Sequence, residues 1–285
     1  MAGEDGRMRI DEFSCDTLTD GAMPTQVTAT LQGHPWDLWG LSKIFDGSNE
    51  TRTLLTAVEP KGKPIFDLRN QEAINRLRVM GYDVFGTLTS TELIWDESKG
   101  SVDLRDVRPV ALNLVERING IALLLDPEYR AVKLISLSYS NTGKVGSSVL
   151  GDWTPNKDMT SLGRHPGQLD FAKAVLGVAR NDNAAKFVLD AIALPRSWAS
   201  LYLIYDAIAA DIGGVHELRK AGWVTPDELT DFTNSANNSR SVPEGARHGN
   251  TPQNGRPLIP LIQAYAIVNK LAVRWLDWVR SNPRV

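Results

Sequence analysis

The sequence has one cysteine, no long apolar run and no large excess of charge of either sign. The single cysteine, Cys15, excludes an intrachain disulfide framework and a cysteine-rich metal site. No stretch approaches the ~20 apolar residues that span a membrane, and the first residues lack the apolar segment of a signal peptide. We therefore expect a cytoplasmic protein without a membrane partner.

The familiar motifs of catalytic and cofactor sites are also missing. None of the four histidines has the spacing to another histidine, a cysteine or a carboxylate that holds a metal. Asn141–Lys144 is similar to the end of a phosphate-binding loop, but the earlier glycine and the following Ser or Thr of that motif are absent. We predict no metal and no cofactor, and the sequence leaves open whether the protein is an enzyme.

Composition and charge are those of a globular protein. The 285 residues are 42% hydrophobic, and 31 Lys and Arg against 34 Asp and Glu give a net charge of -3. Such a chain can bury a sizeable core, but it has no global positive potential that would attract nucleic acid. The length is close to the limit of a single core, so we expect two lobes.

Strand signals dominate residues 25–150, which follow an acidic segment at 1–24 that we interpret as a flexible tail. Turn residues between short apolar runs predict three hairpins: 53–58 with 64–68, 91–95 with 101–104, and a strand with Ile135, Leu137 and Tyr139 on one face before a turn at 141–143. Helical periodicity predicts two helices in this lobe, at 71–80 and 109–125, the second with an apolar stripe of Val110, Leu114, Ile118, Ile121 and Leu125.

The remainder of the chain has a helical period. Glycine and proline between 151 and 168 predict a linker, and residues 169–285 predict an all-helical lobe. We expect its helices at 170–180, 183–193, 196–212, 226–238 and 258–280. Thr225 and Glu228 form a capping box at the start of the fourth, and the last has an apolar stripe of Leu261, Tyr265, Val268, Ala272, Trp275 and Val279. The predicted fold class is therefore α+β, with an N-terminal antiparallel-sheet lobe containing two helices, followed by an all-α helical bundle.

The best candidate for a site is the segment between the last two predicted helices. It contains Arg240, Arg247, His248 and Arg256 among prolines and glycines. From Arg240 onward there are seven basic and two acidic residues, a balance of +5, which leaves -8 for the remaining chain. Arginine binds phosphate and histidine exchanges protons near neutral pH, so we predict catalytic roles for His248 and Arg240 and ligand binding by Arg247 and Arg256. An ordinary solvated loop is the alternative.

A helical lobe with SWASLYLIYDAI, then an ARHG loop and a long terminal helix, resembles the HEPN superfamily of helical bundles in bacterial toxin and defence proteins. The resemblance covers about residues 170–285. Ribonucleases of that family share an Arg, four to six residues and then a His, and a dimer brings two copies together to cleave RNA. In this chain seven residues separate Arg240 from His248, with Pro243 and Gly245 among them.

The resemblance implies a bacterial stress or defence protein that binds, and in one version cleaves, RNA or a nucleotide through its helical lobe. The alternative is a non-catalytic dimeric interaction or scaffold protein whose helices dimerise through aromatic faces. Trp198 and Tyr202 are four residues apart on one predicted helix face, and Trp275 and Trp278 are three apart on another. For these residues we favour core or interface packing over a base-stacking platform.

Overall fold

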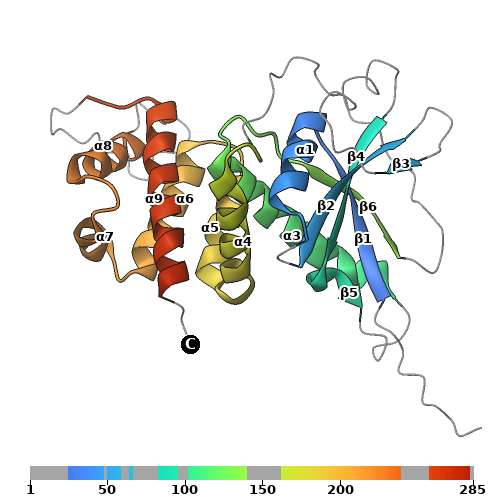
Figure 1. The fold of residues 1–285 in the computed structure, drawn as a ribbon. Helices are drawn as coiled ribbons and strands as arrows, with labels where there is room; N and C mark the ends of the chain where they lie inside the picture. Colours follow the sequence, from blue (N-terminus) through green and yellow to red (C-terminus); the bar gives the residue numbers. More distant parts are fainter. Residues whose placement is uncertain are drawn as a thin grey trace, which may run out of the picture.

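The computed structural model describes residues 25–47, 50–58, 64–66, 83–95, 102–139, 162–238 and 257–282. An antiparallel sheet with helices is followed by a helical region, so the predicted α+β class is confirmed (Figure 1). The predicted tail at 1–24, the helix at 71–80, the turn at 141–143 and the segment 239–256 lie outside the described residues.

The sheet is built around β1 (Thr25–Gln32), which pairs with β4 (Asp83–Ser90), β5 (Ile94–Trp95) and β6 (Lys133–Tyr139). On the other side of β4 lie β2 (Thr51–Val58) and then β3 (Pro64–Phe66). Every pairing is antiparallel. Alternate residues of β1 are fully buried, so one face of the sheet rests on the core.

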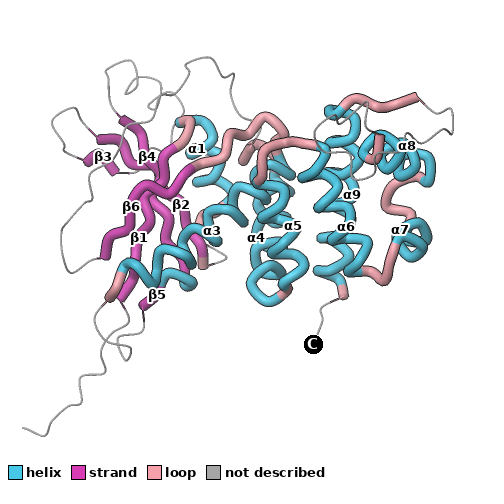
Figure 2. The backbone as a smooth tube through the Cα atoms, turned by 180° about the vertical axis from the view of Figure 1, so that it is seen from behind, coloured by secondary structure: helices cyan, strands magenta, loops and turns pink. Residues whose placement is uncertain are grey.

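Two helices lie between this sheet and the other helices, as both views show (Figures 1 and 2). They are α1 (Pro35–Ile44) and α3 (Leu104–Leu125). The helical region then continues with α4 (Pro166–Asn181), α5 (Asn183–Ala193), α6 (Trp198–Asp211), α7 (Val215–Ala221), α8 (Pro226–Ala236) and α9 (Leu261–Ser281).

Helix α3 joins the two parts of the fold. It packs against β6 on one side and against α4 and α5 on the other, and the buried apolar residues of sheet and helices form one continuous core. Gly120 permits the close approach to α5, because a Cβ there would lie 2.3 Å from the carbonyl oxygen of Leu189. The division into two lobes remains a prediction, but α4 begins within the predicted linker, and Leu162 is fully buried.

Several predicted elements are confirmed. The hairpin of β2 and β3 and the helix 183–193 are present, and the stripe of α9 is buried at Val268, Ala272, Trp275 and Val279. At the start of α8, the Thr225 hydroxyl accepts from Glu228 N at 3.1 Å, and the Glu228 carboxylate accepts from Thr225 N at 2.7 Å. This reciprocal cap satisfies two backbone donors that a helix end leaves open.

The predicted hairpin of residues 91–95 with 101–104 is wrong. Residues Thr91–Leu93 form a 3-10 turn, β5 pairs with β1, and Leu104 already belongs to α3. Asp103 caps α3 by accepting from Arg105 N at 2.9 Å, so the helix begins five residues before Pro109. Val107 lies on the buried face of α3 with Leu114 and Ile118, whereas Val110 is exposed.

Two further differences have local causes. Leu137 and Tyr139 of β6 share the predicted face, but a bulge opposite Thr30 and Leu31 pairs Leu134, rather than Ile135, with Leu31, so Ile135 does not share it. Helix α1 was not predicted, although its start is conventional, because the His34 ring caps it by accepting from Trp36 N at 3.3 Å and Pro35 occupies its first turn. Within the described ranges, no helix is both long and apolar enough to cross a membrane.

Candidate functional site

The predicted site residues Arg240, Arg247, His248 and Arg256 lie outside the described residues, but both ends of their segment are described. At its base, Ile259 N donates to the Ser235 hydroxyl at 2.9 Å, and both residues are buried. This bond ties the chain before α9 to the end of α8. The segment therefore leaves and returns at one place, beside the start of α9.

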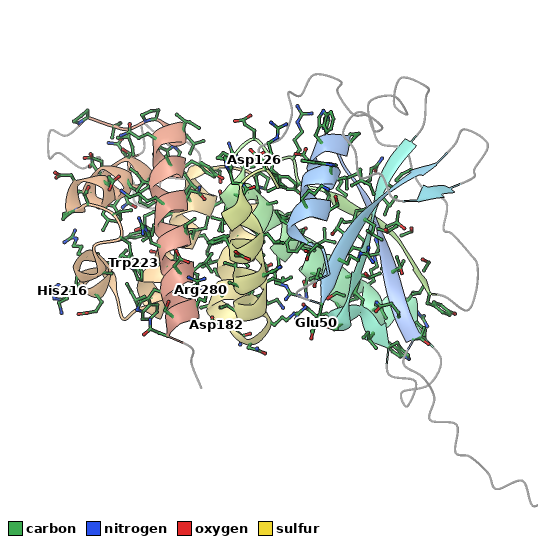
Figure 3. The ribbon with its side chains drawn as sticks, viewed as in Figure 1. Glu50, Asp126, Asp182, His216, Trp223 and Arg280 are labelled. Carbon is green, nitrogen blue, oxygen red and sulfur yellow. The ribbon has the colours of Figure 1, made fainter. Side chains whose placement is uncertain are left out.

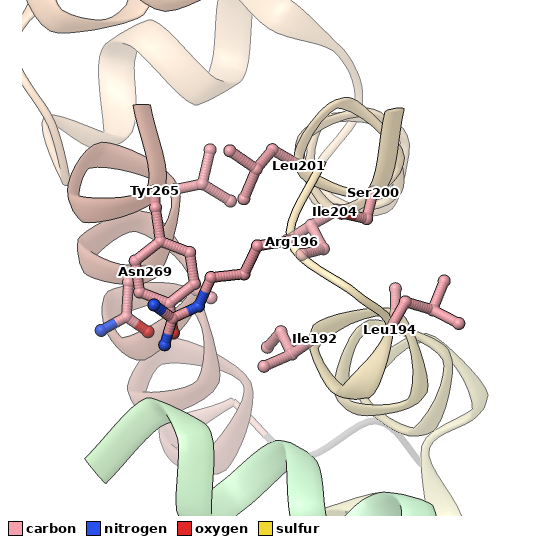
Figure 4. Close-up of a pocket in the computed structure, with 11 residues that line it drawn as sticks. Ile192, Leu194, Arg196, Ser200, Leu201, Ile204, Tyr265 and Asn269 are labelled. Atoms are coloured by element: carbon pink, nitrogen blue, oxygen red, sulfur yellow. The ribbon is translucent and has the colours of Figure 1, made fainter. Parts of the chain in front are cut away.

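A small pocket lies in the same half of α9, between this helix and the connection from α5 to α6 (Figure 4). Its walls are mostly aliphatic, and the polar side chains in it are Arg196, Ser200, Tyr265 and Asn269. The side chains leave room for little more than one water molecule. A larger ligand would therefore lie against the mouth of the pocket, where Arg196 is exposed, rather than inside it.

Arg196 extends across the mouth of this pocket (Figure 4). Its guanidinium carbon lies 4.1 Å from the centre of the Tyr265 ring, and Nη2 donates to the carbonyl oxygen of Pro127. The residue is held in place because Ser197, next to it, caps α6 in a reciprocal bond with Ser200. The guanidinium is thus fixed by contacts with the end of α3 and with α9.

Arg196 is not neutralised by an acid in the part of the chain that the structure describes. The ion pairs found there involve other arginines and lysines. An exposed guanidinium that is stacked on an aromatic ring keeps N–H donors directed at solvent, where they can bind a carboxylate or phosphate. The mouth of the pocket is therefore suited to an anion.

Tyr265 contributes a ring and a hydrogen bond rather than a titrating group. Its hydroxyl donates to the carbonyl oxygen of Leu123 at 3.3 Å. Burial raises the pKa of Tyr265 above its ordinary value, and the nearby Arg196 opposes that shift only in part. The phenol stays protonated at neutral pH, so Tyr265 offers a hydrogen-bond donor and an aromatic ring rather than a proton acceptor.

None of the three described histidines lines this pocket. His34 and His165 stand at the starts of α1 and α4, and His216 lies in the first turn of α7. No group of three or more histidine, cysteine or acidic side chains is placed to hold a metal among the residues with described positions.

The aromatic pairs of the helical region pack against other residues of the same chain. Trp198 and Tyr202 both stack on Phe232, at 6.3 and 6.2 Å between ring centres. Trp275 is fully buried and donates to Asp211 at 3.0 Å, and Trp278 lies against Trp223. The favoured interpretation of these residues as packing is confirmed.

Comparison with known protein families, curated proteins and solved structures finds no match to this chain. Sequence reasoning also did not identify Arg196 or Tyr265 as site residues. Tyr265 was assigned to the apolar stripe of the last helix, and Arg196 to the start of another. Nothing in their spacing shows that they meet, because the two residues are 69 positions apart in the chain.

Proposed function

We propose that the protein binds a phosphate-bearing ligand, RNA or a nucleotide, at the end of the helical region where α9 begins. The observation that carries this proposal is the exposed Arg196 guanidinium, which is fixed over Tyr265 and lacks an acidic partner among the described residues. A stacked guanidinium suits nucleic acid, since it can bind phosphate with its edge and contact a base with its face.

The basic segment supports the same location. Ile259 and Ser235 are joined by a hydrogen bond. Arg256 precedes Ile259 by three positions, and Arg240 follows Ser235 by five. A chain extends by at most ~3.6 Å per residue, so both arginines lie within about 20 Å of that bond. In this proposal Arg247 and Arg256 add phosphate contacts.

The catalytic version of the proposal assigns proton transfer to His248, assisted by Arg240. An imidazole with a pKa near ~6.5 can accept and return a proton near neutrality, which cleavage at a ribose hydroxyl requires. RNA cleavage by the wild type and by His248→Ala, under identical conditions, tests this version. Loss of cleavage with binding retained supports it, and equal cleavage by both proteins contradicts it.

Binding is tested with a fluorescein-labelled single-stranded RNA of mixed sequence and with ATP as a competitor. Arg196→Ala should weaken RNA binding by about ten-fold, which is the loss of one charge-assisted contact. Arg247→Ala should weaken binding and lower the slope against log salt by about one counterion. Arg280→Ala, at the far end of α9 and paired with Asp277, is the matched control and should have little effect. Equal losses in all three variants would contradict a site at the start of α9.

A second candidate function is dimerisation through the helices, and one observation favours it. Phe187 on α5 and Leu194, the residue that directly follows this helix, are exposed apolar side chains, at 46% and 48%. Phe187→Asp should shift a dimer to a monomer in light scattering after gel filtration. Val215→Asp, an exposed apolar position on α7, serves as the control. A wild type that is monomeric at every concentration rejects this function.

A further inference from the structure

A second polar site lies at the opposite junction, where the sheet meets α3 and α4. Figure 3 shows Glu50 there, between the sheet and the helices, well away from Asp126 at the other end of α3. The cluster contains two arginines, Arg117 and Arg180, two acids, Glu50 and Glu92, and the hydroxyls of Thr51, Ser90 and Thr91.

Glu50 has an unusual backbone conformation for its residue type. Its φ is 63°, in the left-handed region that glycine or asparagine normally occupies, and among the described residues it is the one non-glycine with a positive φ. The turn needs this conformation, because Glu50 N donates to the Gly47 carbonyl at 3.1 Å and Gly47 N to the Thr51 carbonyl at 3.1 Å. Glycine would satisfy the turn without strain, so the glutamate must be explained by its side chain.

The Glu50 carboxylate accepts hydrogen bonds from two other elements. Oε2 lies 3.1 Å from Arg180 Nη1 of α4 and 3.0 Å from the Thr91 hydroxyl. Arg180 Nη2 also donates to the Thr51 hydroxyl at 3.2 Å. A guanidinium edge beside hydroxyl groups is the donor set that proteins use for phosphate.

Another anion can replace the Glu50 carboxylate, because Glu92 pairs with both arginines of the cluster. Arg117, whose side chain is 4% exposed, is paired through both Nη atoms with Glu92. The same Glu92 also binds Arg180 at 3.2 Å, so one acid serves two guanidinium groups. Glu50 supplies the second negative charge, and its side chain is 64% exposed. The Glu50 side chain can therefore turn into solvent while Glu92 stays paired with both Arg117 and Arg180.

We infer that Arg180 and Thr91 form a binding site for a phosphate group, which the Glu50 carboxylate occupies in this structure. A ligand phosphate takes the place of Oε2 when the exposed Glu50 side chain turns into solvent. Arg117 stays paired with Glu92 throughout and holds Glu92 against Arg180. This site is separate from the mouth of the Arg196 pocket and does not depend on the function proposed there.

The test uses Glu50→Gly, which removes the internal carboxylate and suits the left-handed backbone. Thermal unfolding is measured with inorganic phosphate and with chloride at equal ionic strength. When phosphate exceeds its Kd about ten-fold, the Tm of Glu50→Gly should rise by about 2–4 °C, with a smaller rise in wild type. Isothermal titration of phosphate into Glu50→Gly should give one site per chain. Should Glu50→Gly not fold, Glu50→Ala replaces it.

Two controls decide whether the site is specific. Arg180→Gln in the Glu50→Gly background should abolish the phosphate-dependent rise. Asp277→Ala frees Arg280 on α9 from its acid at 3.4 Å but has no neighbouring strained turn, so it should respond like wild type. An equal rise in Asp277→Ala and Glu50→Gly, a rise that survives Arg180→Gln, or no rise in either Glu50 variant overturns the inference.

Discussion

At the scale of single residues, Asn119 fixes the connection from α3 to β6. Its side chain is almost fully buried, its Nδ2 donates to Val132 O at 3.0 Å, and its Oδ1 accepts from Val132 N at 3.0 Å and from the Tyr129 hydroxyl at 2.8 Å. Burial, and secondarily the charge of Asp37, raise the pKa of Tyr129 well above its usual value. The Tyr129 hydroxyl is therefore protonated at neutral pH and donates to Asn119.

Asn119→Ala should lower the free energy of unfolding by about 3 kcal/mol, because it leaves several buried polar groups without partners. Tyr129→Phe should lower the free energy of unfolding by only about 1 kcal/mol, since Asn119 keeps both hydrogen bonds to Val132. Urea denaturation at pH 7 measures both values. Equal costs for the two variants would show that the amide does not organise this connection.

Glu116 and Asp190 give the protein a predictable pH dependence. Burial raises the pKa of both carboxyls, and the charge of Asp190 further raises that of Glu116. A folded-state pKa above the unfolded value means that the folded state binds more protons, so stability falls as pH rises through that window. The window begins at the ordinary values of 3.8 for Asp190 and 4.5 for Glu116 and extends upward.

Asp190→Asn should therefore become more stable relative to wild type as pH rises from about 4 to 7, since it removes one raised pKa and lowers the other. Urea denaturation across this range measures the difference. Asp103→Asn is the control, because the hydrogen bond from the Arg105 side chain lowers the pKa of Asp103. As pH rises, the wild type should become more stable relative to Asp103→Asn. A stability trend of the same sign in both variants would contradict the assignment.

At the scale of elements, the crossing of α3 and α5 depends on the absence of a side chain. The contact at Gly120 is made by backbone atoms of α5, which cannot turn aside as the end of a flexible side chain could. The same crossing brings the apolar face of α3 onto Ala185, Val188 and Leu189, which are fully buried. A methyl group at Gly120 has to push the two helices apart.

Gly120→Ala should lower the free energy of unfolding by about 2 kcal/mol or more, despite the better helix propensity of alanine. Gly177→Ala, on the exposed side of α4 with nothing within 4 Å of its Cβ, is the matched control. The free energy of unfolding of Gly177→Ala should rise by up to about 1 kcal/mol. Thermal and urea unfolding measure both, and a neutral Gly120→Ala would mean that the helices are not in contact at this position.

At the scale of the whole molecule, α3 connects the sheet region with the helical region through its packing. It precedes the predicted linker in the chain, yet it packs against α4 and α5, which follow that linker. Leu162 is buried, and Gly163 N donates to the Gln168 side chain at 2.7 Å, so the end of the predicted linker is part of the packed structure. A cut in the linker would leave these contacts intact.

Limited proteolysis should cut between residues 151 and 161, where glycine and proline oppose regular structure, rather than at 162–168. The two fragments should elute together in gel filtration and separate only in denaturant, because α3 buries apolar surface on both of them. Separate elution under native conditions would show that the two lobes are independent, as the sequence alone suggests.

Local chemistry along the chain determined most of the elements. The period of α9, the turn between β2 and β3 and the Thr225–Glu228 cap depend on neighbouring residues, so the sequence alone determines them. Errors arose where local signals compete. The Asp103 cap made α3 begin before Pro109, and a bulge moved the inward position of β6 from Ile135 to Leu134.

The tertiary structure alone decided which distant residues meet. Arg196 and Tyr265, or Glu50, Thr91 and Arg180, become neighbours because helices and strands pack by shape and buried area, which leaves no fixed interval in the sequence. Charge composition did determine that the basic residues gather near the end of the chain. The packing of α8 against α9 and the hydrogen bond from Ile259 to Ser235 place the ends of their segment beside the start of α9.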